Sequence, residues 1–460
     1  MSRLITGVCL LITFAVLAGC GGVEQARARR EVPGVAGGVS SIDTAGDQAT
    51  AADFDYHGWK AFRLTNGMVT VVVVPDMGGR VIEYKLGGHS FLWADPGEPP
   101  QKATGREAST AWRDFGGYKA WPAPQAKWTP PPDAAAAAFD SGPWTGKITV
   151  PQGRSAEVEL TSPEDRSSGL QVTRTVQLFG GSSRVQITEK FTNRSGKPAE
   201  WAIRQATQLV GIVEQGAAID GKSRVYLPLS PNSKLRDGYR LEGTGGGAQF
   251  KVLSDRLLQA AYQGQGAVAF ADAQAGWVAA VDEAHGYAFV QRFGVSPLGN
   301  YPEDGSTVGI RVTAKPPCLE VSLFSALRTL QPEESLEVST DWYAARVSGP
   351  VVSCSDVAAV REPLKLTRKD NKLRLTGTLG VFAPGSLALN LQDGSGTAIG
   401  QPTLVKVSPA EEVKLDQVVP EEPAAKKLVV ELQNGRGTPL GEVGSLDMGV
   451  MVARTASTEK

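Results

Sequence analysis

Histidine is scarce in this chain, with three residues among 460. They stand apart, at His57, His89 and His285. No histidine lies near a cysteine at the spacing of a zinc site, and no CxxC occurs. We therefore predict no metal site and no cofactor. His57 precedes the first predicted strand, and His89 and His285 are expected to be exposed turn residues beside glycines.

An excess of positive charge is also missing. The chain has 47 Lys and Arg against 48 Asp and Glu, a net charge of −1. Nucleic acid is therefore excluded as a partner, because phosphate backbones require a basic surface. Long helical periodicity is absent too, whereas 53 glycines and 29 prolines favour many short strands joined by turns.

A hydrophobic run long enough to span a membrane is not found either. Residues 4–17 are apolar, follow Arg3 and end in Leu-Ala-Gly-Cys at residues 17–20. The run is too short for a comfortable span and fits the core of a signal peptide. The four residues match the lipobox of bacterial lipoproteins, in which Cys20 is acylated and becomes the new N-terminus. The alternative is an ordinary secretory signal with a chance cysteine.

We therefore predict a lipid-anchored protein of the bacterial cell envelope, with residues 1–19 as the signal peptide. Position 21 holds glycine rather than the aspartate that often retains lipoproteins at the inner membrane, which favours the outer membrane. After processing, Cys318 and Cys354 remain as the two cysteines outside the signal and the lipid site. They can pair in an oxidising envelope or remain two buried free thiols.

The rest of the chain divides by composition into a tether, two domains and a tail. Residues 20–52 are predicted to be a flexible tether, 53–347 a large all-β domain, 360–454 a small β-sandwich and 455–460 a disordered tail. Thr65-Asn66-Gly67 between apolar runs predicts a hairpin. Many short strands after residue 146 predict two extended, packed antiparallel sheets. The small sandwich has Phe382 as its one aromatic residue, so we expect it to be a spacer or packing module.

A long irregular insertion is predicted over residues 94–146. It contains WRDFGGYKAWPAPQAKW at residues 112–128, with three tryptophans, two lysines and Pro-Ala-Pro. Aromatic rings, a cation and an amide this close together are typical of a concave binding site. The alternative is a loop pinned to a sheet by its own tryptophans.

Several segments resemble one family of proteins. They are VPDMGGRV at 74–81 with 88–93, GGYKAWPAPQ at 116–125, Trp201 with Gln205, NYP at 300–302, and CLE at 318–320 running on to Trp342. Over residues 54–345 the chain resembles galactose-mutarotase-like β-supersandwich domains, and most closely the uncharacterised bacterial family DUF4380. The resemblance implies an all-β supersandwich and a carbohydrate ligand.

Mutarotases typically use a glutamate as base and a histidine as acid to open a pyranose ring, with an arginine that holds hydroxyls. By resemblance Glu320 is the candidate base and Arg80 the candidate arginine. No histidine here stands in a mutarotase-like motif, so Lys119 is the best substitute acid, with Tyr118 or a carboxylic acid as alternatives. Each candidate also has a purely structural interpretation. Glu320 can be a carboxylate that points outward from its strand, Arg80 can form a structural salt bridge, and Lys119 can make a cation–π contact that fixes the loop.

The remaining candidates would bind rather than react. Trp121 and Trp128 can stack on sugar faces or pack in the core, and Gln125 and Gln205 can bind hydroxyls or satisfy loop backbone. The family pattern also leads us to expect an acid where Gly309 stands.

Three hypotheses follow. The first is a non-catalytic carbohydrate-binding lipoprotein. The second is an aldose-1-epimerase-like isomerase with Glu320 as base. The third is a structural lipoprotein without a ligand. Protein partners are not indicated by the sequence.

Overall fold

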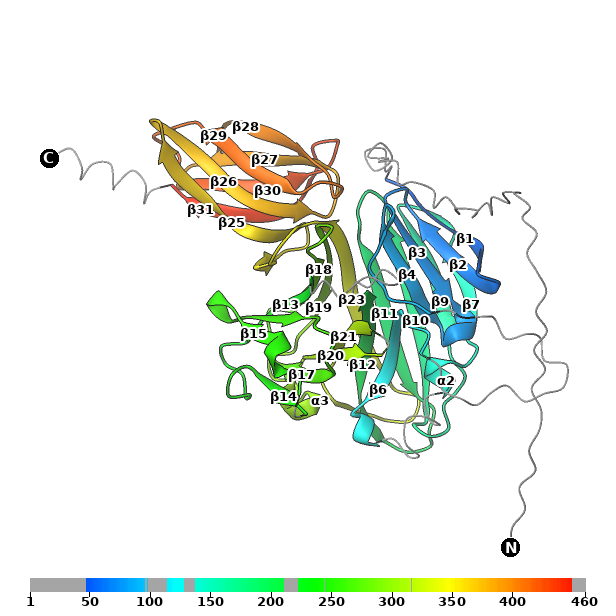
Figure 1. Cartoon of the computed structure of the whole chain (residues 1–460). Coiled ribbons are helices and arrows are strands. Elements are labelled where there is room, and N and C mark those ends of the chain that lie inside the picture. Colours follow the sequence, from blue (N-terminus) through cyan, green and yellow to red (C-terminus); the bar gives the residue numbers. More distant parts are fainter. Residues whose placement is uncertain are drawn as a thin grey trace, which may run out of the picture. The chain divides into compact units, whose positions relative to one another are not determined.

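The computed structural model describes residues 47–95, 97, 114–127, 137–210, 222–243, 245–315 and 317–448. All of them belong to one compact unit, residues 39–460. They are built almost entirely of β-strands, and every strand pair is antiparallel, as in the hairpin β1–β2 (Figure 1). No helix among these residues is long and apolar enough to cross a membrane.

The first sheet has thirteen strands. In spatial order they are β14 (Tyr239–Glu242), β17 (Ala267–Ala271), β20 (Val308–Ala314), β21 (Pro317–Phe324), β12 (Ala199–Val210), β6 (Tyr118–Ala123), β4 (Arg80–Leu86), β3 (Val69–Val74), β2 (Trp59–Thr65), β1 (Ala49–Tyr56) and β8 (Gln152–Gly153), with β22 (Arg328–Leu330) beside β12 and β5 (His89–Ser90) beside β4.

The second sheet has ten strands. Their order is β15 (Phe250–Val252), β16 (Leu257–Ala261), β13 (Ser223–Pro228), β18 (Trp277–Asp282), β19 (Tyr287–Phe293), β23 (Ser335–Arg346), β11 (Val185–Asn193), β10 (Leu170–Phe179), β9 (Ser155–Thr161) and β7 (Thr145–Val150). One hydrophobic core joins the inner faces of the two sheets. Strict alternation of buried and half-buried residues along β10 shows how period-2 patterning turns one face of a strand inward.

Two four-stranded sheets form the C-terminal sandwich around a separate core. They are β24 (Ser353–Cys354), β25 (Ala358–Lys369), β26 (Lys372–Val381) and β29 (Val413–Val419), and β28 (Ala398–Val407), β27 (Gly385–Gln392), β30 (Lys427–Gln433) and β31 (Pro439–Asp447). Helical turns are short: η1 (Pro75–Met77), η2 (Gln125–Lys127), α2 (Ala137–Asp140), η3 (Gly247–Gln249), η4 (Ser254–Arg256) and α3 (Pro302–Gly305).

The all-β prediction is confirmed, and the Asn66-Gly67 hairpin forms between β2 and β3. The Asn66 side chain accepts hydrogen bonds from the backbone of Met68 and Val69, which fixes the turn. Two boundaries differ from the prediction. Strand β1 begins at Ala49, inside the segment expected to be tether, and β24 begins at Ser353, ahead of the expected start of the small sandwich.

Residues 94–146 were predicted to form an irregular insertion. This prediction is wrong for residues 118–123, which form the central strand β6. Its register with β12 runs from Tyr118↔Thr207 to Ala123↔Ala202, whereas it meets β4 at one pair, Val81↔Tyr118. Pro122 lies beyond that single pair. A proline is tolerated where one side of a strand has no ladder to join, because its missing N–H then removes no inter-strand bond.

Candidate functional site

Strand β6 separates its side chains onto two faces of the first sheet. Lys119 and Trp121 point away from the core between the sheets, together with Arg204 and Gln208 of β12. Arg204 lies opposite Trp121 in the ladder, and Gln208 lies two residues beyond Ala206, the partner of Lys119. Glu320 of β21 lies opposite Gln208 on the same face. The outer face of β6, β12 and β21 therefore brings together three of the residues predicted from the sequence: Lys119, Trp121 and Glu320.

Lys119 is almost entirely buried on this face. Its Nζ lies 3.1 Å from Asp140 Oδ1, 3.9 Å from Asp114 Oδ1 and 4.4 Å from the ring centroid of Trp121. The ammonium group is therefore held by two carboxylates and an aromatic ring at once. The cation–π contact that the sequence offered as an alternative to a role for Lys119 as an acid is therefore present.

Arg80 is fully buried, with its guanidinium directed at protein groups. Nη2 lies 2.6 Å from Asp140 Oδ1, and Nη1 donates to the Gly116 carbonyl at 2.6 Å. With no exposed surface, Arg80 cannot contact a bound ligand directly in this arrangement. Arg80 instead helps to hold β6 in place, because Asp140 bonds both Arg80 and Lys119 of β6.

The two glycines before Arg80 make room for another part of the chain. Both have positive φ, +69° at Gly78 and +62° at Gly79. A Cβ on Gly78 would lie 2.4 Å from the Asp140 carbonyl oxygen, and one on Gly79 would lie 2.4 Å from the Trp144 ring. The glycines therefore admit the segment that carries Asp140, a residue that the sequence analysis missed.

Glu320 is buried and paired with Arg204. Arg204 Nη2 lies 2.6 Å from Glu320 Oε1, its Nε donates to Ser322 Oγ at 2.9 Å, and its Nη1 to Gln125 Oε1 at 3.3 Å. Burial by itself would raise the pKa of Glu320, but Arg204, Lys119 and Arg311 together lower the pKa below its ordinary value. Glu320 is thus a carboxylate at neutral pH, already engaged by a cation.

A cavity of about 150 Å³ opens beside this pair. Its lining includes Gln125, Arg204, Glu303, Arg311, Ser322 and the rings of Phe270 and Phe324. Gly309, where the family pattern led us to expect an acid, forms part of the wall. A Cβ there would lie 3.3 Å from both phenylalanine rings, so the glycine keeps this part of the cavity open.

Tyr118 and Gln205 lie on the opposite face, in the core between the sheets. Gln205 Nε2 donates to Tyr118 Oη at 3.0 Å, Tyr118 Oη donates to Glu189 Oε1 at 2.9 Å, and Thr340 donates to Gln205 Oε1 at 2.6 Å. Both predicted residues are therefore separated by the sheet from a ligand on the Trp121 face. Sequence alternation along β6 could have shown that Tyr118 and Lys119 face opposite ways.

The three histidines lie away from this face. His57 occupies the β1–β2 turn with φ +53°. His89 stacks on Tyr287 at 4.0 Å, and burial lowers its pKa to about 4. His285 is exposed at the β18–β19 turn, as predicted, with Nδ1 2.7 Å from Asp282 Oδ2.

Cys318 and Cys354 are free thiols. No group of three or more His, Cys, Asp or Glu side chains suited to a metal ion occurs in the part of the chain that the structure describes. Cys20 and Trp128 lie outside the described residues.

Several solved structures similar to this chain have mutarotase or aldose 1-epimerase in their names. A galactose mutarotase-like protein of Clostridium acetobutylicum is 15% identical, with 65% of this chain and 98% of that chain covered and a TM-score of 0.42. A galactose mutarotase related enzyme of Lactobacillus acidophilus is 10% identical, with 63% and 98% covered and a TM-score of 0.39. Identities and TM-scores this low do not transfer chemistry or ligand.

No curated protein sequence matches the chain. A family model does: "Domain of unknown function (DUF4380)" matches residues 60–345, more than half of the sequence. That range includes both large sheets except β1, the first residue of β2 and the last residue of β23, together with every residue placed above on the Trp121 face. The resemblance drawn from the sequence motifs is thus confirmed at the level of the family, and the chain belongs to the DUF4380 family.

Proposed function

We propose that the DUF4380 domain binds a carbohydrate on the outer face of β6, β12 and β21, without catalysis, and that the protein is anchored to the cell envelope through a lipid on Cys20. The observation that supports the binding site is the cavity beside the Arg204–Glu320 pair. Donors and acceptors there are fixed by one another, and two phenylalanine rings provide apolar walls. This combination suits a sugar, which presents hydroxyls at its edge and C–H groups on its faces.

The size of the cavity fits one sugar ring. A cavity needs roughly 10–15 Å³ to hold one water molecule, so a cavity of about 150 Å³ holds on the order of ten water molecules. Trp121 is 8% exposed and does not line the cavity, so it would contact only a ligand that extends beyond the cavity, and through a ring edge rather than a whole face.

The state of Glu320 supports binding over catalysis. A general base must be able to accept a proton near the operating pH. The pKa of Glu320 is lowered, and Arg204 occupies one of its oxygens at 2.6 Å. None of the three histidines stands on this face to act as the acid.

An aldose-1-epimerase-like activity is the second candidate, and one observation favours it. Glu320 is an ionised carboxylate whose charge is balanced in part by Lys119, so a base and a proton-carrying group share one face. In that reaction Glu320 would take the anomeric hydroxyl proton while Lys119 protonated the ring oxygen.

Tryptophan fluorescence tests these proposals. The full chain is titrated with D-galactose, D-glucose, D-xylose and their disaccharides, beside Trp121→Ala and Lys119→Ala. A saturable change that both variants weaken supports the site. Polarimetry on the bound sugar then separates binder from epimerase. No response from any sugar would favour a structural lipoprotein instead.

A further inference from the structure

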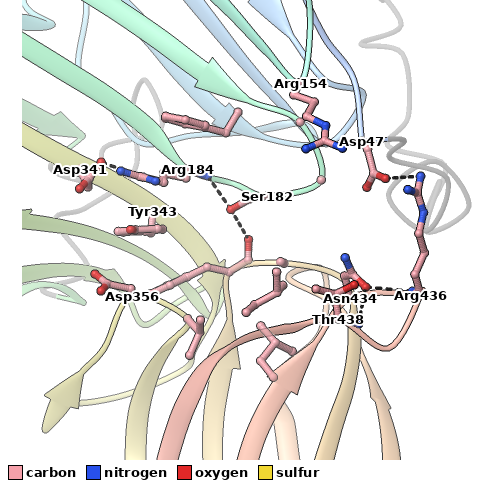
Figure 2. Close-up of a pocket in the computed structure, with 18 of the residues that line it drawn as sticks. Asp47, Arg154, Ser182, Arg184, Asp341, Tyr343, Asp356, Asn434, Arg436 and Thr438 are labelled. Carbon is pink, nitrogen blue, oxygen red and sulfur yellow. Dashed lines mark hydrogen bonds and ion pairs between the residues drawn. The ribbon is translucent and has the colours of Figure 1, made fainter.

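A second cavity, of about 760 Å³, lies between the large domain and the C-terminal sandwich. Figure 2 shows its two sides: Arg154, Ser182 and Arg184 come from the large domain, and Asn434 and Arg436 come from the sandwich. No residue of the Trp121 face lines it. Cavities between domains are frequent sites for small ligands.

The two sides of this cleft are joined by specific contacts. Ser183 N donates to the Phe382 carbonyl at 2.8 Å, and Ser182 Oγ donates to the same oxygen at 3.2 Å. The rings of Tyr343 and Phe382 stack at 4.5 Å across the junction. The walls are thus positioned before any ligand arrives, which reduces the entropy cost of binding.

Guanidinium and carboxylate groups alternate around the cleft. Arg184 Nε lies 2.8 Å from Asp341 Oδ1, and Arg436 Nη2 lies 2.5 Å from Asp47 Oδ2. Arg154 is exposed, and its guanidinium has no hydrogen-bond or ion-pair partner among the described residues. The third aspartate of the lining, Asp356, is paired with Arg292, which does not line the cleft, so Arg154 is the one lining arginine without an ion pair among the described residues.

These groups define the chemistry of a ligand. Carboxylates accept hydrogen bonds from hydroxyl groups, guanidinium groups donate to them, and an unpaired guanidinium fits a carboxylate in a bidentate pair. A bare anion such as phosphate is disfavoured, because the aspartates repel its charge and it has few hydrogen-bond donors to offer them. A polyhydroxyl molecule with one carboxylate can donate to the aspartates through its hydroxyl groups and accept from the arginines through its carboxylate.

We propose that this cleft binds an acidic saccharide, a short glycan containing a uronic acid, with its carboxylate on Arg154 and its hydroxyls on the Arg–Asp pairs. The volume exceeds that of the cavity beside Arg204 fivefold, so it admits an oligosaccharide. The C-terminal sandwich then completes a binding site. The proposal is independent of the function proposed for the Trp121 face.

Isothermal titration of the full chain with trigalacturonate tests it, with maltotriose as the neutral trisaccharide. We expect trigalacturonate to bind, and Arg154→Ala to weaken it by about tenfold to a hundredfold, as for loss of a charge-assisted bond. Arg154→Lys should recover part of the affinity, because a lysine keeps the charge but not the fork.

Two controls separate this site from a general charge effect and from the first site. Arg166→Ala removes an exposed arginine that does not line the cleft and should leave the affinity unchanged. Trp121→Ala should do so as well. The proposal is overturned if trigalacturonate does not bind, if maltotriose binds equally well, or if Arg154→Ala binds as the wild type does. A loss of affinity in Trp121→Ala alone would also overturn it, by assigning the ligand to the other face.

Discussion

The Asp140 carboxylate lies 3.1 Å from the Lys119 ammonium, and both side chains are almost entirely buried. The same oxygen lies 2.6 Å from Arg80 Nη2. One carboxylate therefore compensates two cations in the protein interior and ties α2 to β6. The Trp121 face depends on this contact, because Lys119 is held over the Trp121 ring from there.

Asp140→Asn should destabilise the protein strongly. It would leave Arg80 and Lys119 buried without their shared counter-charge, and breaking a buried ion pair costs about 3–5 kcal/mol. Urea unfolding measures the change. Asp416→Asn is the control, since Asp416 pairs with Arg374 on the surface and should have a negligible effect. Equal stability of the two variants would contradict the role given to Asp140.

Gly78→Ala should cost more stability than Gly67→Ala. Both glycines have positive φ, so both variants incur about 1–2 kcal/mol of backbone strain. A Cβ at Gly78 also meets the Asp140 carbonyl at 2.4 Å, whereas nothing lies within 4 Å of one at Gly67. Thermal unfolding of both variants is compared, and the difference between their losses of stability gives the cost of the steric clash at Gly78. Equal losses of stability would mean that the segment at Asp140 moves aside freely.

Tyr118→Phe should lower the free energy of unfolding by about 1–3 kcal/mol, because it removes the hydroxyl between Gln205 and Glu189 and leaves the buried Gln205 Nε2 without its acceptor. Tyr262→Phe is the matched control, since the Tyr262 hydroxyl is buried without a hydrogen-bond partner in the described structure. That variant should be neutral or slightly stabilising. Sugar affinity at the Trp121 face should survive Tyr118→Phe.

The stability contributed by Glu320 should depend on acid pH. Its folded pKa is below the ordinary value of 4.5, so the contribution is fully present above pH 4.5. It is lost as the pH falls through the folded pKa. The difference in unfolding free energy between wild type and Glu320→Gln should therefore shrink below about pH 4.5. A difference that stays constant down to pH 3 would show that folding does not lower the pKa of Glu320.

Cys20→Ser should abolish the lipid anchor. If Cys20 is acylated, radiolabelled palmitate is incorporated into the wild type and not into the variant, and the variant leaves the membrane fraction. Cys354→Ser, which keeps the lipobox intact, should behave as the wild type. Palmitate incorporation into Cys20→Ser would refute the lipoprotein assignment.

Much of the fold could be predicted from residue patterning. Strands β17, β18 and β19 are among the short strands expected after residue 146, because the apolar runs there are bounded by glycine and aspartate. Strand β6 was missed because Pro122 argues locally against a strand. Only the arrangement of β4 and β12 around it shows that the proline breaks no ladder.

The roles given to the candidate residues stay predictions. The structure places Lys119, Trp121 and Glu320 on one face of the first sheet, and it buries Arg80, which motif resemblance could not distinguish from an arginine that contacts a ligand. Asp140 follows an alanine-rich segment without a motif, and Arg204 had no feature that distinguished it from other arginines on strands. Such partners depend on contacts between residues far apart in sequence.

Filling the cavity beside Arg204 tests the central claim most directly. Gly309→Val places a side chain beside Phe270 and Phe324, in a cavity that Lys119, Trp121 and Glu320 do not line. Binding is measured by titration calorimetry with the sugar that gives the strongest fluorescence response. Gly266→Val is the control, because nothing lies within 4 Å of a Cβ placed at Gly266. If the sugar occupies this cavity, Gly309→Val loses saturable binding while Gly266→Val retains it at a similar unfolding midpoint. Undiminished binding by Gly309→Val would show that the sugar site lies elsewhere.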